Sequence, residues 1–151
     1  MKDITYGEAG KADIPDLVQL LALLFIIEKD FKPDTSKQQT GLALVLKNSA
    51  TATMQVAKND TGKVIGMVSA QLVISTAEGA VSAWVEDMVI EESYRGHGIG
   101  KQLLQNALKW AKNKGATRAQ LLVDTENTEA LGYYQHLNWE TTQLQARRVI
   151  L

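Results

Sequence analysis

The stretch "YRGHGIGKQLL", residues 94–104, decides the fold. Three glycines, Gly96, Gly98 and Gly100, occupy alternate positions directly before an apolar pattern with helical spacing. A glycine-rich turn between a strand and a helix leaves backbone N–H groups unpaired at the positive end of the helix dipole, and glycine lets an anion approach the backbone. The stretch therefore predicts a phosphate-binding loop, with tight strand-to-helix packing as the alternative role for these glycines.

Two common phosphate motifs do not fit this loop. A P-loop would need a glycine where Arg95 stands and a Ser or Thr where Gln102 stands. A dinucleotide fingerprint needs the spacing G-x-G-x-x-G near the start of a βαβ unit, whereas the spacing here is G-x-G-x-G and the unit comes late in the chain. A different phosphate ligand is therefore expected.

The composition limits the classes of function. The 151 residues have the length of one domain, 1–151, and the net charge of -1 favours neither nucleic acid nor an anionic membrane as a partner. The chain has no cysteine, which excludes disulfides and an acyl group stored on a thiol. The apolar run at residues 20–27 is too short to span a bilayer, and the acidic residues before it do not resemble a secretory signal. We expect a cytoplasmic location.

Apolar periodicity, turn residues and cap residues predict an α/β fold with a mixed sheet. The expected helices cover residues 12–29, with Asp13 as N-cap, 35–48, with Thr35 and Gln38 at capping-box spacing, 99–114 and 127–137, with Asn127 as N-cap. The expected strands cover residues 3–7, 53–58, 63–75, 81–90 and 118–124, followed by one or two closing strands in 139–151. The strand at 118–124 should run parallel to that at 81–90 because a helix crosses over between them.

These residues together resemble the GNAT superfamily of acyl-CoA-dependent N-acyltransferases. "YRGHGIGKQLL" is similar to the family's Q/R-x-x-G-x-G/A pyrophosphate loop, with Arg95, Gly98 and Gly100 at the specified places. "VEDMVI" looks like the family's fourth strand, and "LLVDTENTEALGYYQHLNWE" contains its N-x-x-A-x-x-F/Y-Y helix, with Asn138 in place of a common glycine. The resemblance implies a mostly antiparallel mixed sheet, about four helices, and splayed fourth and fifth strands.

The resemblance implies acetyl-CoA as the cofactor. The pantetheine arm would pair with the backbone of Met88, Val89 and Ile90. The amides of the loop would take the pyrophosphate, and the helix after the fifth strand would complete the site. The implied cofactor-binding residues outside the strand are Arg95, Gly96, His97, Gly98, Ile99, Gly100, Lys101, Asn127, Ala130 and Tyr134.

The reaction is direct attack of an amine on a thioester, and it needs a base and an acid. An amine of lysine type has a pKa of about 10.4, so its deprotonation at neutral pH costs roughly 4–5 kcal/mol. Glu86 and Asp87 are the candidate bases, because both interrupt an apolar strand, and strand alternation would point them to opposite faces. The family pattern favours Glu86 as the catalytic base and Tyr134 as the acid, while Tyr133 is expected to be a core ring. A structural hydrogen bond or ion pair is the alternative role for each.

By the same resemblance, the acceptor pocket lies between the first two helices and the fourth strand. The residues expected to line it are mainly acidic, with two aromatic rings: Glu28, Asp30, Phe31, Asp34, Trp84, Glu86 and Asp87. Such a set suits a small cation, so a polyamine, diamine or basic amino acid is the leading acceptor class. For the acids near residue 30 the alternative is a solvated turn.

Other functions stay open at this point. A protein or peptide N-acetyltransferase and a non-catalytic acyl-CoA-binding sensor are the alternatives, and a homodimer is possible because relatives often dimerise. His97 and His136 have no third ligand at metal spacing, so we expect both on the surface and no metal site.

Overall fold

The computed structural model describes residues 3–151. The chain forms two compact units, one ending at Gln120 and the other beginning at Leu121. The strands are β1 (Thr5–Glu8), β2 (Ala52–Lys58), β3 (Val64–Ser75), β4 (Ala80–Ile90) and β5 (Arg118–Leu121). The helices are α1 (Ile14–Ile27), α2 (Thr35–Lys47), α3 (Ile99–Asn113) and α4 (Thr128–His136), with short 3-10 turns at Lys11–Asp13 and Glu92–Tyr94.

The strands form one sheet in the order β1-β2-β3-β4-β5, which is mixed and mostly antiparallel as the sequence predicts. β3 and β4 make the longest pair, with Gln71 opposite Trp84 and Ser69 opposite Glu86. β5 joins the start of β4, where the Thr117 N–H donates to the Val81 carbonyl at 3.2 Å. Because β5 has only four residues, it ends well before the last residues of β4.

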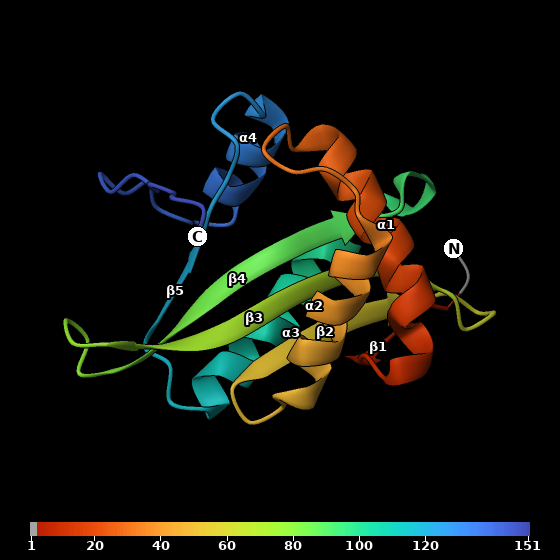
Figure 1. Ribbon diagram of the computed structural model, residues 1–151, viewed down its shortest axis with the longest axis horizontal. Coiled ribbons are helices and arrows are strands. Elements are labelled where there is room, and N and C mark those ends of the chain that lie inside the picture. Colours follow the sequence, from red (N-terminus) through yellow and green to blue (C-terminus); the bar gives the residue numbers. More distant parts are fainter. Residues whose placement is uncertain (1–2) are drawn as a thin grey trace. The chain divides into compact units, whose positions relative to one another are not determined.

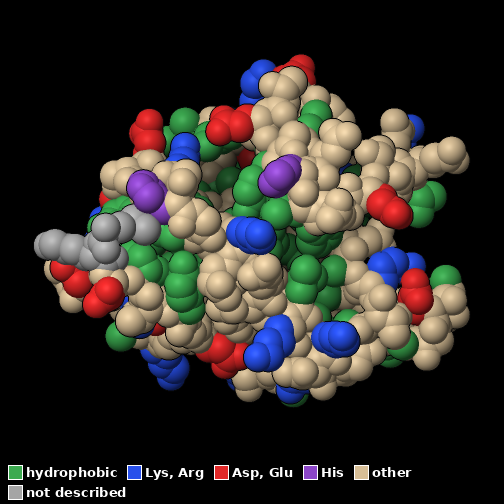
Figure 2. Space-filling model, turned by 180° about the vertical axis from the view of Figure 1, so that it is seen from behind, with side chains coloured by type: hydrophobic (Ala, Val, Ile, Leu, Met, Phe, Trp, Pro, Cys, Tyr) green, Lys and Arg blue, Asp and Glu red, His purple; other side chains and the backbone are tan. Residues whose placement is uncertain are grey.

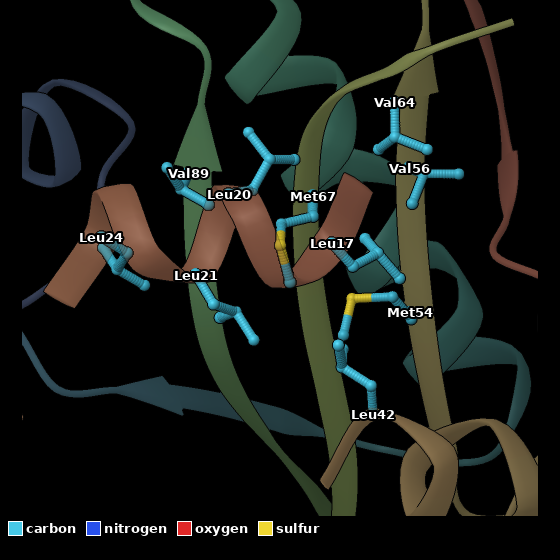
Figure 3. Close-up of a cluster of buried hydrophobic side chains, with 10 residues drawn as sticks. All are labelled: Leu17, Leu20, Leu21, Leu24, Leu42, Met54, Val56, Val64, Met67 and Val89. Atoms are coloured by element: carbon cyan, nitrogen blue, oxygen red, sulfur yellow. The ribbon is translucent and has the colours of Figure 1, made fainter. Parts of the chain in front are cut away.

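Helices cover both faces of the long strands. α1 and α2 lie in front of β2, β3 and β4 in Figure 1, and α3 lies behind them. The front core is built from α1 leucines packed on sheet side chains, as Figure 3 shows for Leu17 beside Met67 and for Leu21 and Leu24 along β4. Its buried members are Leu17, Leu20, Leu21, Leu24, Leu42, Met54, Val56, Val64, Met67 and Val89. Burying each such side chain contributes about 1.5–3 kcal/mol.

The helix after the glycine loop is strongly amphipathic. Its buried positions follow helical spacing, at Ile99, Leu103, Leu104, Ala107 and Ala111. Its outer positions include exposed lysines, and Figure 2, which shows the molecule from behind, has Lys and Arg side chains on this face. One side of α3 is thereby fixed to the sheet, and its N-terminus is held at the end of the loop.

Several expected details are wrong. Residues 139–151 contain no strand, because their apolar side chains stay exposed, Leu144 at 84% and Ile150 at 82%, and no ladder forms. β5 ends at Leu121 rather than at residue 124, and α1 ends two residues before Lys29.

The caps also differ in part from the expectation. Asp34 rather than Thr35 is the N-cap of α2, since its carboxylate accepts from the Lys37 N–H at 3.1 Å. Asp13 precedes α1 as expected, but its carboxylate accepts from the Gly10 N–H at 2.8 Å and pairs with Lys58 instead of capping that helix.

Candidate active site

The glycine loop leaves its amides open. Gly96 and Gly98 have φ of +78° and +76°, a left-handed conformation that favours glycine, and a Cβ built on either would meet no atom within 4 Å. Gly98 is the N-cap of α3. Among residues 3–151, the amides from Gly96 to Lys101 donate to no carbonyl or side chain. A run of unpaired amides at a helix N-terminus, with free space above it, fits a diphosphate.

Interactions within the chain hold this loop in place. The Arg95 guanidinium folds back, and its Nε donates to the Ile90 carbonyl at 2.9 Å. His97 is exposed, with its Nδ1 3.2 Å from the Tyr94 carbonyl. The Tyr94 hydroxyl in turn accepts from the Asn59 side-chain amide at 3.2 Å. Arg95 therefore offers a ligand its backbone, while its side chain supports the loop.

A second tie joins the β2–β3 turn to the same region. Lys63 Nζ lies 2.9 Å from Glu91 Oε2, one residue beyond β4. The turn that contains Asn59 and Lys63 thus supports the start of the loop at two points. The sequence of this turn, "NDTG" at residues 59–62, is typical of a hairpin turn and does not indicate the supporting role.

β4 contains a bulge at the predicted base. Met67 pairs with Val89 and Ser69 with Glu86, so Val68 alone lies opposite Asp87 and Met88. Asp87 has φ of +56°, in the left-handed region that Asp tolerates better than most residues. The alternation that would send Glu86 and Asp87 to opposite faces is therefore interrupted. No residue pattern in "VEDMVI" indicates a bulge.

Asp87 has a perturbed pKa. Burial, then the charge of Glu86, then that of Glu28 raise the pKa of Asp87 from 3.8 to about 7. Glu28 ends α1 as its C-cap, and Glu86 precedes Asp87 on β4. The three carboxylates predicted to lie near one acceptor are therefore close enough to interact. A carboxyl group that titrates near neutral pH can take and release a proton under cellular conditions.

Trp84 and Glu86 interact directly on β4. The indole Nε1 of Trp84 donates to Glu86 Oε1 at 2.6 Å, and the Glu86 side chain is exposed. A groove of about 340 Å³ begins beside Trp84 and runs over the outer part of the β3–β4 hairpin. Side chains that line it include Val73, Ile74, Ser75, Trp84, Arg118 and Gln120. Glu28, Glu86 and Asp87 are not among the residues that line this groove.

The segment between α1 and α2 divides into two kinds of residue. Phe31 is about half exposed, and its ring lies 5.5 Å from that of Phe25, centroid to centroid. Its N–H donates to the Glu28 carbonyl at 3.4 Å, which keeps the ring near the end of α1. Asp30 is exposed, and Asp34 has the capping role described above. Of the acids in this segment, Glu28 alone acts on Asp87.

The predicted pantetheine edge lies at the end of β4. Val89 is buried in the core, whereas Met88 and Ile90 are half-buried. Because β5 is too short to reach this part of β4, these residues have an edge that β5 does not cover. This edge leads directly into the glycine loop, as a ligand with a long arm and a diphosphate requires.

The second unit contains the other predicted residues. Asn127 caps α4 as predicted, since its side chain accepts from the Ala130 N–H at 3.1 Å, and Asn138, which replaces a common glycine, has φ of +66°. Tyr134 packs edge-on against Tyr133 and Trp139, at ring distances of 5.4 and 5.9 Å. The buried hydroxyl of Tyr133 has no hydrogen-bond partner among residues 3–151, and burial raises its pKa.

Two kinds of site are absent from the described part of the chain. Residues 3–151 contain no group of three or more His, Cys, Asp or Glu that could hold a metal ion. No helix among them is both long and apolar enough to cross a membrane.

The family of the chain follows from comparison with known sequences. Residues 15–139, which span both compact units, match the sequence model of the acetyltransferase (GNAT) family. The chain belongs to this family. It is therefore a GNAT-type N-acetyltransferase, and the predicted family, fold class and enzyme class are confirmed.

Individual known proteins share between about a fifth and a third of their aligned residues with this chain. The glucosamine 6-phosphate N-acetyltransferase of Trypanosoma brucei brucei is 27% identical over 97% of this chain and 98% of its own length. An uncharacterized N-acetyltransferase of Methanocaldococcus jannaschii is 31% identical over 55% of this chain, which spans only 37% of that relative. The crystal structure of a transcriptional regulator from Bacillus halodurans has a TM-score of 0.85 at 24% identity, covering 98% of this chain and 100% of that one, and shows the fold alone.

Proposed function

We propose that this GNAT enzyme transfers an acetyl group from acetyl-CoA to a small cationic primary amine, such as a polyamine, a diamine or a basic amino acid. The observation that carries the acceptor class is the cluster of Glu28, Glu86 and Asp87, in which burial first, and then the charges of Glu86 and Glu28, raise the pKa of Asp87 to about 7. An ammonium group relieves this repulsion, because it brings a positive charge to the place where three carboxylates interact.

The cofactor would bind along β4 and the glycine loop. Acetyl-CoA supplies the activated acetyl thioester. The amides from Gly96 to Lys101 would take the diphosphate, and Lys101, which is exposed, adds a positive charge. The backbone of Met88, Val89 and Ile90 would hold the pantetheine arm, and Asn127, Ala130 and Tyr134 are proposed as further cofactor-binding residues.

Asp87 is the base in this proposal, and Glu86 attracts and orients the ammonium. Proton transfer from an amine of pKa about 10.4 to an ordinary carboxylate of pKa about 3.9 costs about 9 kcal/mol, and transfer to a group of pKa about 7 costs about 5 kcal/mol. The raised pKa therefore makes Asp87 the better base. Glu86, favoured by the sequence pattern, is exposed and bonded to the Trp84 indole, which suits it to holding the cation.

The protons balance in a direct transfer. The amine nitrogen bonds to the acetyl carbon, and the carbon–sulfur bond breaks. The nitrogen loses two protons on going from ammonium to amide. Asp87 takes one of them for release to solvent, and the other restores the Tyr134 hydroxyl, which has given its own proton to the leaving sulfur.

A second acceptor, an amino sugar phosphate, is favoured by a different observation. The relative from Trypanosoma brucei brucei matches nearly the whole chain, and its name states glucosamine 6-phosphate as the acceptor. Arg118 lines the groove beside Trp84 and is a cation that could pair with a phosphate, although it already contacts Glu78 at 3.5 Å. The carboxylates of Glu28, Glu86 and Asp87 argue against an amino sugar phosphate, because its phosphate would add a negative charge near them.

The test is CoA release from acetyl-CoA across a panel of acceptors, with product mass confirmed. The panel contains polyamines, diamines, basic amino acids, glucosamine 6-phosphate and short peptides. Turnover confined to cationic small amines supports the leading proposal. Turnover of glucosamine 6-phosphate that Arg118→Ala weakens supports the second. Turnover of peptides alone overturns both proposals. Both are also overturned if no acceptor in the panel is acetylated while acetyl-CoA still raises the melting temperature of the protein.

A further inference from the structure

The bulge in β4 places Asp87 in an unfavourable backbone conformation, which other contacts must stabilise. Asp87 lies at φ of +56°, which costs a non-glycine residue about 1–3 kcal/mol unless its surroundings impose it. In a regular strand the same residue would return to the extended conformation, and its side chain would point elsewhere. The peptide bond that joins Glu86 to Asp87 sets this geometry, because rotation of that peptide changes φ of Asp87 directly.

Ser69 is bonded to that peptide. Its hydroxyl donates to the backbone carbonyl of Glu86 at 3.1 Å, and Ser69 is only 1% exposed. It lies opposite Glu86 in the β3–β4 register, at the last regular pair before the bulge. The hydrogen bond is part-buried, and it is made to the carbonyl whose direction fixes the bulge.

The neighbours of Ser69 make a hydroxyl at this position unusual. Met67, Val68 and Ala70 are all fully buried and apolar, so the same strand position would accept an alanine at lower desolvation cost. A buried hydroxyl is stable here because it has an acceptor, and the acceptor is a carbonyl of the bulge. The bond gives the Ser69 hydroxyl an acceptor and the Glu86 carbonyl a donor, and it orients the peptide before Asp87.

We propose that Ser69 is a positioning residue, which holds the Glu86–Asp87 peptide so that the carboxyl group of Asp87 faces Glu86, Glu28 and the acceptor amine. The inference rests on the proposed function, in which Asp87 takes a proton from that amine. Ser69 touches neither substrate nor cofactor in this role. It acts only through the backbone of β4.

The test compares Ser69→Ala with Ser69→Cys, which retains a weak donor of similar size. The control is Thr53→Val, which removes another buried hydroxyl from the same sheet, one that donates to Glu8 at 3.2 Å. The first readout is the pH dependence of kcat/KM. The second is the titration of the Asp87 carboxyl followed by carbon-13 NMR, which does not depend on turnover.

For Ser69→Ala we expect kcat to fall about tenfold, since misplacing a reacting group by about 1 Å can cost up to about 100-fold. The Asp87 titration should move down by about one unit or more, because burial and the charges of Glu86 and Glu28 are what raise it. Ser69→Cys should lie between Ser69→Ala and the parent, and Thr53→Val should change neither readout. The inference is overturned if Ser69→Ala keeps the parental titration, or if Thr53→Val shifts it equally.

The two readouts separate the inference from the proposed function. If the parent enzyme acetylates no amine in the panel, the function fails, and the NMR titration still reports whether Ser69 positions Asp87. If the parent is active and the titration of Asp87 does not respond to Ser69, the positioning role fails while the function stands.

Discussion

The indole nitrogen of Trp84 donates a hydrogen bond to the carboxylate of Glu86 at 2.6 Å. Both residues are on β4, two positions apart, and this bond limits the directions in which Glu86 can point. Trp84→Phe removes the donor and keeps an aromatic ring. We expect KM for a cationic amine to rise about tenfold with little change in kcat, since a hydrogen bond to a charged group contributes about 1.5–3 kcal/mol. Trp110→Phe on α3 is the matched control, and an equal effect there would contradict the role of Trp84.

Asp87→Asn should abolish the pH dependence of catalysis near neutrality. A base must be ionised to accept a proton, and the pKa of Asp87 is raised to about 7 by burial, Glu86 and Glu28. In the parent, kcat/KM should therefore rise with pH and level off above about 8. Asparagine cannot take the proton, and removing a general base typically costs about 100-fold or more in rate. If kcat/KM of Asp87→Asn still falls at low pH as it does in the parent, another residue is the base, and Glu86→Gln is the next variant to measure.

The same carboxyl group should make the fold less stable as the pH rises. An unfolded aspartate loses its proton near pH 4, whereas Asp87 in the fold keeps it up to about pH 7. Between these values the folded state binds more protons, so the free energy of unfolding falls with rising pH, by up to about 4 kcal/mol in total. Urea unfolding at pH 5 and pH 8 measures this. Asp87→Asn should remove that part of the loss and be more stable than the parent at pH 8.

Tyr134→Phe should lower kcat and leave cofactor binding intact, because it removes the proposed proton donor and keeps the ring. A fall of about 100-fold is typical for loss of a general acid. Tyr133→Phe is the neighbouring control, since the Tyr133 hydroxyl is buried without a partner among the described residues. Removing that hydroxyl should be neutral or stabilise the fold by about 1 kcal/mol. Full activity of Tyr134→Phe at every pH, or equal losses in both variants, would exclude Tyr134 as the acid.

Gly98→Val should prevent acetyl-CoA from binding. The valine side chain would occupy the space above the loop, and φ of +76° is unfavourable for a β-branched residue. Gly79→Val at the tip of the β3–β4 hairpin carries a similar backbone strain, at φ of +63°, away from the loop. Isothermal titration with CoA should detect binding to Gly79→Val and not to Gly98→Val. Equal affinities would show that the loop does not bind the diphosphate.

The sequence was sufficient to predict the glycine loop, the α3 spacing, the positions of the first five strands along the chain and the α4 cap, because each depends on local patterns of apolar, glycine and cap residues. The bulge at Asp87 and the role of Ser69 depend on pairing between β3 and β4, which no local pattern reveals. The closing strands predicted in residues 139–151 do not form, because a strand also needs a neighbour to pair with. The homodimer and the cytoplasmic location stay predictions.

The hydrogen bond from Asn59 to Tyr94 and the ion pair between Lys63 and Glu91 affect how much the loop must reorganise when a cofactor binds. They join the β2–β3 turn to the start of the loop at two points. A preorganised loop does not lose conformational entropy on binding, and ordering even one side chain costs about 0.5–1.5 kcal/mol. If the loop binds the diphosphate of CoA as proposed, binding should need no closing motion, so the association rate should depend on solvent viscosity only through diffusion.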